Sequence, residues 1–311
     1  MGAAKFLRGL IRIADPAGVT VVVNTGDDDR FYGLAVSPDL DTITYTLAGV
    51  ANRRMGWGRE GDSFECLASL QRFYGPGWFN LGDRDLATHV YRSERLANGA
   101  TLARITSEIG RAFDVRARVL PMSNDRVRTV VDTRRGPLSF QRYLIAERAR
   151  PQPLGVRYLG KRRAAPAPGV LRAIQSADLV IVAPSNPILS IGPILAVPGI
   201  REALDRRRRP VVAVSPLVGG RAVTGPLVRL LRAAAVPSTS KGIASCYRSF
   251  LDALVIDRQD RADAAELRSL GVQPIVTNTV FDSTARAART ARHILQTLRL
   301  PARTGRTTGA A

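Results

Sequence analysis

The spacing of hydrophobic residues changes repeatedly along this chain, and the change predicts an α/β fold. Short aliphatic runs, as at residues 19–23 and 211–214, are typical of strands that are buried on both faces. Between these runs, apolar residues recur every three or four positions, as they do in a helix that buries one face. Strands that alternate with helices indicate a Rossmann-like parallel sheet with helices on both faces.

The alternation is clearest after residue 170. Strands are expected at 179–183, 211–214, 253–256 and 273–277, followed in turn by helices near 193–205, 225–234, 261–269 and 282–299. Near the N-terminus, a strand at 19–24 lies between helices at 3–13 and 38–50. We expect residues 1–50 and 170–300 to form one Rossmann-like core.

Residues 51–169 interrupt this pattern and are predicted to be an insertion of helices and a β-hairpin. Helices are expected at 62–73, 83–97 and 101–113, and strands at 115–120, 126–132 and 138–145. Residues 147–169 are rich in Pro, Arg and Ala and are predicted to include an irregular surface connection. The whole is expected to be one domain over 1–300, with a disordered tail at 301–311.

Composition excludes several classes of protein. Hydrophobic residues make up 45% and charged residues 23% of the 311 residues, which is ordinary for a globular protein. No apolar stretch approaches the roughly 20 residues of a membrane span, and the first residues lack the features of a secretory signal. We therefore expect a cytoplasmic protein with no membrane partner. Cys66 and Cys246 are far apart and are expected to be two structural thiols.

The formal net charge of +20 raises the question of a nucleic-acid partner. Nearly all the cations are arginines, and they are scattered along the chain apart from the run at 206–209. That run follows a predicted helix, whose C-terminal end favours cations. The charge pattern therefore indicates solvated arginines and no nucleic-acid partner.

Carboxylates gather where the first predicted strand ends. Asp27, Asp28 and Asp29 follow that strand, and Asp39 and Asp41 come shortly afterwards in the first turn of the predicted helix 38–50. A helix start favours acidic residues by itself, which accounts for the last two but not for the first three. In open α/β sheets ligands bind beyond the carboxyl ends of the strands, and several carboxylates together are typical of a Mg²⁺ site.

Two further strand ends lead into polar loops rich in Gly and Pro. Residues 184–187 follow the strand 179–183, and residues 215–220 follow the next strand. Exposed backbone N–H groups in such loops bind phosphate, as in a nucleotide site. The same loops also serve as the tight turns of any βα unit, so the pattern alone does not decide between the two.

The segments together resemble the 2-phospho-L-lactate transferase family (CofD-like) of coenzyme F420 biosynthesis. The resemblance runs through nearly the whole chain in these segments: V-V-N-T-G-D-D, S-P-D-L-D-T, Y-T-L, G-W-G, L-G-D-R-D-L-A-T-H, L-P-M-S-N-D, A-P-S-N-P-I-L-S-I-G-P-I-L, V-P-G-I-R, A-V-S-P-L-V and F-L-D-A-L-V-I-D.

The resemblance implies a transferase. The acceptor would be Fo, a deazaflavin with a ribityl chain, and the donor a guanosine diphosphate ester of 2-phospholactate or of a related acid such as phosphoenolpyruvate or phosphoglycerate. The terminal ribityl hydroxyl would attack the donor's β-phosphorus, GMP would leave, and the product would be F420-0 or its dehydro form. Mg²⁺ is the implied metal, and we also expect a homodimer. The alternative is a nucleotide- or sugar-phosphate-binding regulator on the same fold, without turnover.

The resemblance also assigns roles to individual positions. Asp41 would contact Fo and is the candidate to orient the attacking hydroxyl or accept its proton, and Asn80 lies at a second Fo-contacting position. Asp27, Asp28 and Asp39 are expected to hold the metal. The donor's nucleotide and phosphates would be bound by Gly2, Lys5, Ser185, Asn186, Ser190 and Gly192.

Two departures from the family pattern stand out. The family opens with a strand and a G-G-x-G loop, of which only Gly2 is present, so the true start is expected to lie upstream and the first strand of the sheet to be missing. Asn80 replaces a residue that is basic in archaeal relatives.

The dispersed arginines lead to a first testable prediction. The purified protein should show no sequence-dependent binding to DNA or RNA at physiological salt, because no recognition motif accompanies the charge. Fluorescence anisotropy with several unrelated oligonucleotides measures this directly. Sub-micromolar affinity for one sequence over the others would contradict it.

Overall fold

The computed structural model describes residues 2–223 and 225–299, so the expected tail at 301–311 lies outside the described residues. Its centre is a sheet of four parallel strands in the order β13-β12-β9-β8. The strands are β8 (Val180–Val182), β9 (Val211–Val214), β12 (Ala253–Asp257) and β13 (Gln273–Thr277). All four occur where the aliphatic runs predicted them.

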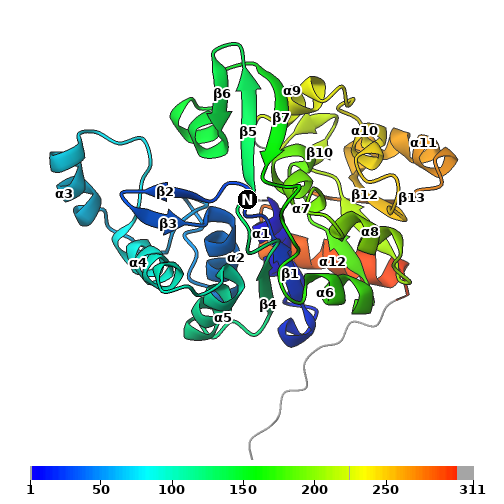
Figure 1. The fold of residues 1–311 in the computed structure, drawn as a ribbon. Helices are drawn as coiled ribbons and strands as arrows, with labels where there is room; N and C mark the ends of the chain where they lie inside the picture. Colours follow the sequence, from blue (N-terminus) through cyan, green and yellow to red (C-terminus); the bar gives the residue numbers. More distant parts are fainter. Residues whose placement is uncertain (1, 224, 300–311) are drawn as a thin grey trace, which may run out of the picture.

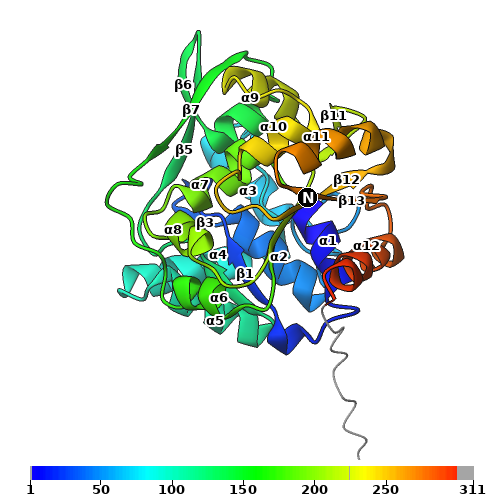
Figure 2. The same cartoon turned by 90° about the vertical axis from the view of Figure 1, so that its right-hand side faces the viewer.

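Helices cover both faces of this sheet, because alternate strand residues point to opposite sides. Val212 and Val214 pack with Phe6 of α1 (Gly2–Leu10) and with α12 (Thr284–Thr297). Figures 1 and 2 show these two helices side by side on one face. Val211 and Ala213 face the larger core cluster on the other side. Helices that contribute buried residues to this cluster include α6 (Val170–Ser176), α8 (Ile200–Asp205), α10 (Ser240–Ser245) and α11 (Ala264–Ser269).

A second parallel pair consists of β1 (Thr20–Val23) and β4 (Arg118–Pro121). The two parallel sheets are not hydrogen-bonded to each other within the described residues, so the single predicted sheet is realised as two. Helix α1 joins them, since Phe6 lies in the core of the larger sheet and Leu7 in the core of the smaller one. The smaller sheet also packs against α2 (Pro38–Ala48) and α5 (Leu102–Ala112).

The remaining elements surround these sheets. Between β1 and α2 lies a hairpin of β2 (Asp29–Phe31) and β3 (Leu34–Val36), and α3 (Glu65–Tyr74) and α4 (Asp83–Ala97) follow α2. A three-stranded antiparallel sheet of β5 (Arg128–Thr133), β6 (Gly136–Ser139) and β7 (Pro153–Leu159) projects from the body (Figure 1). The shorter pieces are β10 (Leu217–Val218), β11 (Arg221–Ala222), α7 (Gly192–Leu195), α9 (Leu227–Ala233), η1 (Pro16–Gly18), η2 (Arg142–Ala146), η3 (Pro187–Ile191) and η4 (Arg258–Asp263).

Two local predictions were wrong, and one strand was missed. The missed strand is β7, which lies within the stretch expected to include an irregular connection and forms because pairing with β5 outweighs its Pro and Arg content. The strand expected at 138–145 ends at Ser139 and passes into the helical turn η2. The helix expected at 193–205 is divided into α7 and α8, since Pro198 cannot continue a helix and Gly199 has a φ of 90°.

No helix in the described part of the chain is both long and apolar enough to cross a membrane.

The contact between α1 and α12 gives a test of the packing. A Cβ at Gly9 would clash with the backbone of Ala287 and Ala288. Gly9→Ala should therefore lower the free energy of unfolding by about 1–3 kcal/mol, as overpacking does. Gly110→Ala in α5 is the matched control, because nothing lies within 4 Å of its added Cβ. Chemical denaturation should show the control unchanged or about 0.5–1 kcal/mol more stable. Equal effects at the two sites would contradict this packing.

Candidate functional site

Asn24 organises the loop that follows β1. Its side-chain oxygen accepts a hydrogen bond from the Gly26 N–H at 2.7 Å, which closes a tight turn. Its side-chain nitrogen donates to Asp27 at 3.0 Å and to Asp39 at 3.1 Å. One amide group therefore brings a carboxylate from the end of the strand next to one from the start of α2.

Asp28 completes this cluster. Its Oδ2 accepts a hydrogen bond from Ser37 Oγ at 2.6 Å, and Ser37 is the residue just before α2. Its Oδ1 is buried and has no hydrogen-bond partner among the described residues. Asp27, Asp28 and Asp39 are called the acidic cluster below.

Burial and mutual repulsion make the acidic cluster hard to ionise. Desolvation raises the pKa of Asp27 well above its usual range, and the charges of Asp39 and Asp28 raise it further. Desolvation likewise raises the pKa of Asp28 and of Asp39. Buried carboxylates that repel one another, with an oxygen left unpaired, fit the oxygen-ligand preference of Mg²⁺. The chemistry of the expected metal ligands therefore suits the ion, although the binding itself stays a prediction.

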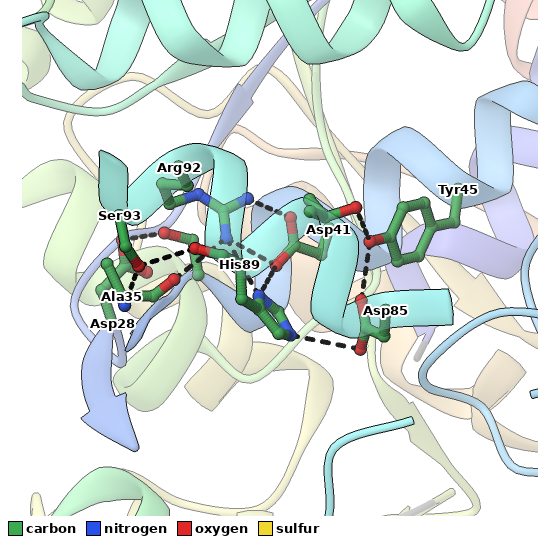
Figure 3. A network of polar contacts seen from close by, with 10 residues as sticks. Asp28, Ala35, Asp41, Tyr45, Asp85, His89, Arg92 and Ser93 are labelled. Atoms are coloured by element: carbon green, nitrogen blue, oxygen red, sulfur yellow. Dashed lines mark hydrogen bonds and ion pairs between the residues drawn. The ribbon is translucent and has the colours of Figure 1, made fainter. Parts of the chain in front are cut away.

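Asp41 belongs to a different group of residues. From its place in the first turn of α2, its carboxylate was expected to lie among the metal ligands, but it pairs with an arginine instead. Arg92 of α4 donates to both of its oxygens, to Oδ2 at 3.1 Å and to Oδ1 in a closer contact. The Asp41 residue is only 5% exposed. Its charge is balanced inside the protein (Figure 3).

His89 extends this buried pair toward a second carboxylate. Its ring nitrogens lie 3.7 Å from Asp41 and 3.4 Å from Asp85, and Tyr45 donates a hydrogen bond to Asp85 at 2.6 Å. Burial opposes ionisation of Asp85, but the neighbouring His89 lowers its pKa overall.

Asp41, Asp85 and His89 lie close enough to one another to be considered a metal site. Arg92 and Tyr45 already donate hydrogen bonds to the carboxylate oxygens there. The group is therefore better described as a polar network whose carboxylates have protein partners, called the compensated network below. The acidic cluster, which has no such compensation, is the better candidate for a metal.

The loop after β8 (residues 184–193, the β8 loop) lies against both the loop after β1 (residues 24–28, the acidic loop) and the start of the chain. A Cβ at Gly26 would be 3.0 Å from Cβ of Pro193, and a Cβ at Gly2 would clash with the carbonyl of Pro184. Three separate segments therefore converge: the first turn of α1, the acidic loop and residues 184–193.

Inside the β8 loop, Asn186 is a helix cap. Its side-chain oxygen accepts hydrogen bonds from the N–H groups of Ile188 at 2.9 Å and Leu189 at 3.1 Å. Gly192 lies directly under the Tyr158 hydroxyl, where a Cβ would clash. Ser185 and Ser190 are half-buried in the same loop.

Two predicted site residues, Lys5 and Asn80, take no part in the contacts described so far. Lys5 is half-buried in α1, one turn after Gly2. Asn80 is exposed in the loop before α4, and within the described residues no hydrogen bond joins its side chain to the acidic cluster.

A pocket of about 240 Å³ lies beside the acidic cluster. The loop residues Gly26, Asp27 and Asp28 form one wall, and the antiparallel sheet forms the other. Gln141 crosses from the second wall and donates to Asp27 at 3.4 Å. A larger pocket of about 370 Å³ between η2 and α9 contains none of the predicted site residues.

Sequence reasoning missed Arg92, His89 and the residues of the antiparallel sheet. A signal existed for the first two: Asp85, His89 and Arg92 are spaced four and three residues apart, which places them on one face of α4. No local pattern marks the sheet residues, because their place beside the acidic loop arises from tertiary packing.

Comparison with known proteins identifies the family to which this chain is similar. The profile of "2-phospho-L-lactate transferase CofD" matches residues 1–295. A Streptomyces griseus protein named phosphoenolpyruvate transferase is 42% identical over 309 residues, covering 96% of this chain and 97% of its own length. The 2-phospho-L-lactate transferase of Methanosarcina mazei is 38% identical over 295 residues, covering 95% and 97%.

The chain belongs to the CofD family of transferases, as the sequence motifs indicated. A solved structure of a UPF0052-family protein from Bacillus halodurans has a TM-score of 0.63 at 20% identity, and covers 95% of this chain and 96% of that protein. At this identity the likeness confirms the predicted fold class.

The raised pKa values predict how stability depends on pH and on cations. Without a cation, the folded protein binds more protons on the acidic cluster than the unfolded chain does. The free energy of unfolding should therefore fall as the pH rises from the ordinary carboxylate range near 3.8 through the raised values. A cation that replaces these protons should restore stability.

Thermal melts in EDTA and in excess Mg²⁺ measure this linkage. We expect Mg²⁺ to raise Tm more at about pH 8 than at about pH 5, and Asp28→Asn to reduce the difference. The same Tm shift at both pH values would be inconsistent with a proton-competing cation at this cluster.

Proposed function

We propose that this chain transfers a 2-phospholactyl or phosphoenolpyruvyl group from a guanosine diphosphate ester to Fo, with release of GMP. The reaction would take place where the acidic loop, the β8 loop and the start of α1 converge. The uncompensated acidic cluster at this point carries the proposal, because it could hold the cation that a diphosphate donor needs to neutralise its negative charge. The names of the relatives divide between the two transferred groups, so the esters of both acids remain candidate donors.

Asp27, Asp28 and Asp39 would hold the Mg²⁺ ion. When bound, such an ion neutralises charge on the diphosphate and on the leaving GMP. Asn24 and Ser37 keep the three carboxylates in place through hydrogen bonds of 2.6–3.1 Å. This preorganisation means that the carboxylates do not have to be gathered when the donor arrives.

The donor's guanosine diphosphate is assigned to the β8 loop and the first turn of α1. Ser185, Ser190 and the backbone around Gly192 offer hydrogen-bond donors near the acidic loop, while Asn186 fixes the loop conformation by capping it. Lys5 supplies a cation on the neighbouring helix. Gly2 allows α1 to approach the loop closely.

Fo is assigned to the side of the site formed by Asp41 and Asn80. Because Arg92 already binds both oxygens of Asp41, we assign Asp41 an orienting role toward the ribityl hydroxyl. Each carboxylate oxygen has a further lone pair with which to accept that hydroxyl. The relatives found are transferases, so the alternative of a non-catalytic regulator gains no support.

Release of GMP tests the proposed function. The protein, Fo and Mg²⁺ should be mixed in turn with guanosine diphosphate esters of phospholactate, phosphoenolpyruvate and phosphoglycerate. GMP and a deazaflavin product should form together with at least one donor. GMP formation that is independent of Fo would indicate hydrolysis and would argue against transfer.

Substitution of one expected metal ligand tests the metal dependence of the reaction. Asp28→Asn should lower kcat by about 10²-fold or more, since it removes a charged ligand candidate while keeping the hydrogen bond to Ser37. Asp282→Asn is the control, because that carboxylate pairs with Arg286 on the surface at α12. Circular dichroism should show both variants folded. Full activity of the wild type in excess EDTA would overturn the metal assignment.

A further inference from the structure

The wall opposite the acidic cluster carries two arginines that the proposed function does not use. Arg128 of β5 and Arg157 of β7 line the same pocket as Asp27 and Asp28. Asp132 accepts two hydrogen bonds from Arg157, at 2.7 and 2.6 Å, and so neutralises it. Among the ion pairs of residues 2–223 and 225–299, none includes Arg128. Arg128 is thus the uncompensated cation of the pocket.

Thr129 adds a hydroxyl to the same wall. It is 1% exposed, it lines the pocket, and its Oγ1 has no hydrogen-bond partner among the described residues. A Cβ at Gly26 would be 2.6 Å from this oxygen, so the absence of a side chain at Gly26 keeps the hydroxyl beside the acidic loop. A buried hydroxyl without a partner is costly, and a bound ligand oxygen would satisfy it.

Aliphatic side chains form another part of the wall. Val130, Leu138 and Leu159 line the pocket beside the two arginines. The pocket therefore offers a free guanidinium, an unpaired hydroxyl and an apolar surface, and it opens beside the carboxylates proposed to hold the metal. A small organic anion with a short carbon skeleton matches this combination.

We propose that this pocket binds the acid moiety of the donor, and that Arg128 pairs with its carboxylate. The proposal rests on the proposed function, in which that acid is esterified to the donor's β-phosphate. An α-phosphorylated acid carries its carboxylate only a few bonds from phosphorus, so its subsite must adjoin the acidic cluster. Two parallel N–H groups of Arg128 match the two oxygens of a carboxylate. The Thr129 hydroxyl donates to an oxygen of the same moiety.

This assignment makes Arg128 a specificity-determining residue. All three candidate acids carry the carboxylate, so Arg128 selects the class of donor and not one member of it. A lysine at this position would keep the charge but lose the paired hydrogen bonds. Arg128→Lys should therefore retain only part of the preference that Arg128→Gln loses.

Calorimetric binding with Mg²⁺ present tests the subsite without requiring turnover. The titrants are the guanosine diphosphate ester of phospholactate and its carboxamide analogue. The wild type should bind the carboxylate ester about 10- to 100-fold more tightly than the amide. Arg128→Gln should bind both with the affinity of the wild type for the amide, and its affinity for GDP should be unchanged. Arg134→Gln, at the exposed turn between β5 and β6, is the control and should retain the wild-type preference.

The outcomes separate this proposal from the one on which it rests. Equal affinity of the wild type for the two esters, or an unchanged preference in Arg128→Gln, would overturn the carboxylate subsite. Failure of the wild type to release GMP in the presence of Fo, with the binding preference intact, would overturn the transferase assignment and leave the subsite standing.

Discussion

Repulsion among three carboxylates, one buried and two half-buried, is the constraint on which the rest of the site depends. Asp27 and Asp28 come from a strand end and Asp39 from a helix start, and neither element alone would place them together. Asn24, bonded to both Asp27 and Asp39, holds the two elements in register. Burial then raises the pKa of each carboxyl group. The fold keeps an unfavourable concentration of negative charge, which attraction to a divalent cation would offset.

The neighbouring pair of Asp41 and Arg92 shows what compensation looks like in the same region. Both side chains are buried, and their opposite charges form an ion pair at hydrogen-bond distance. Removing one partner of such a pair costs about 3–5 kcal/mol, because the other charge is left buried and alone. The charge of Arg92 lowers the pKa of Asp28 and the charge of Asp41 raises it, so the compensated network acts on the uncompensated cluster in both directions. The two groups differ in charge balance, although each includes a carboxylate from the first turn of α2.

Much of this arrangement could be predicted from the sequence, and the rest depends on long-range packing. Aliphatic runs marked β1, β9, β12 and β13 because strands buried on both faces need such runs. The order of motifs identified the family. The partner of Asp41 was missed because Arg92 lies 51 residues away along the chain. The place of β7 was missed because pairing with β5, not local composition, makes that segment a strand.

Three glycines at the site show how the packing itself creates the proposed chemistry. Gly2, Gly26 and Gly192 have no positive φ angle, so none of them is required by a left-handed turn. At each position, another part of the chain occupies the space that a Cβ would need: Pro184, Thr129 with Pro193, and Tyr158. Substitution there would move α1, the acidic loop or the β8 loop away from its neighbour. The absence of side chains at these positions thus lets three distant segments meet, and their meeting is what places candidate phosphate-binding loops beside the carboxylates.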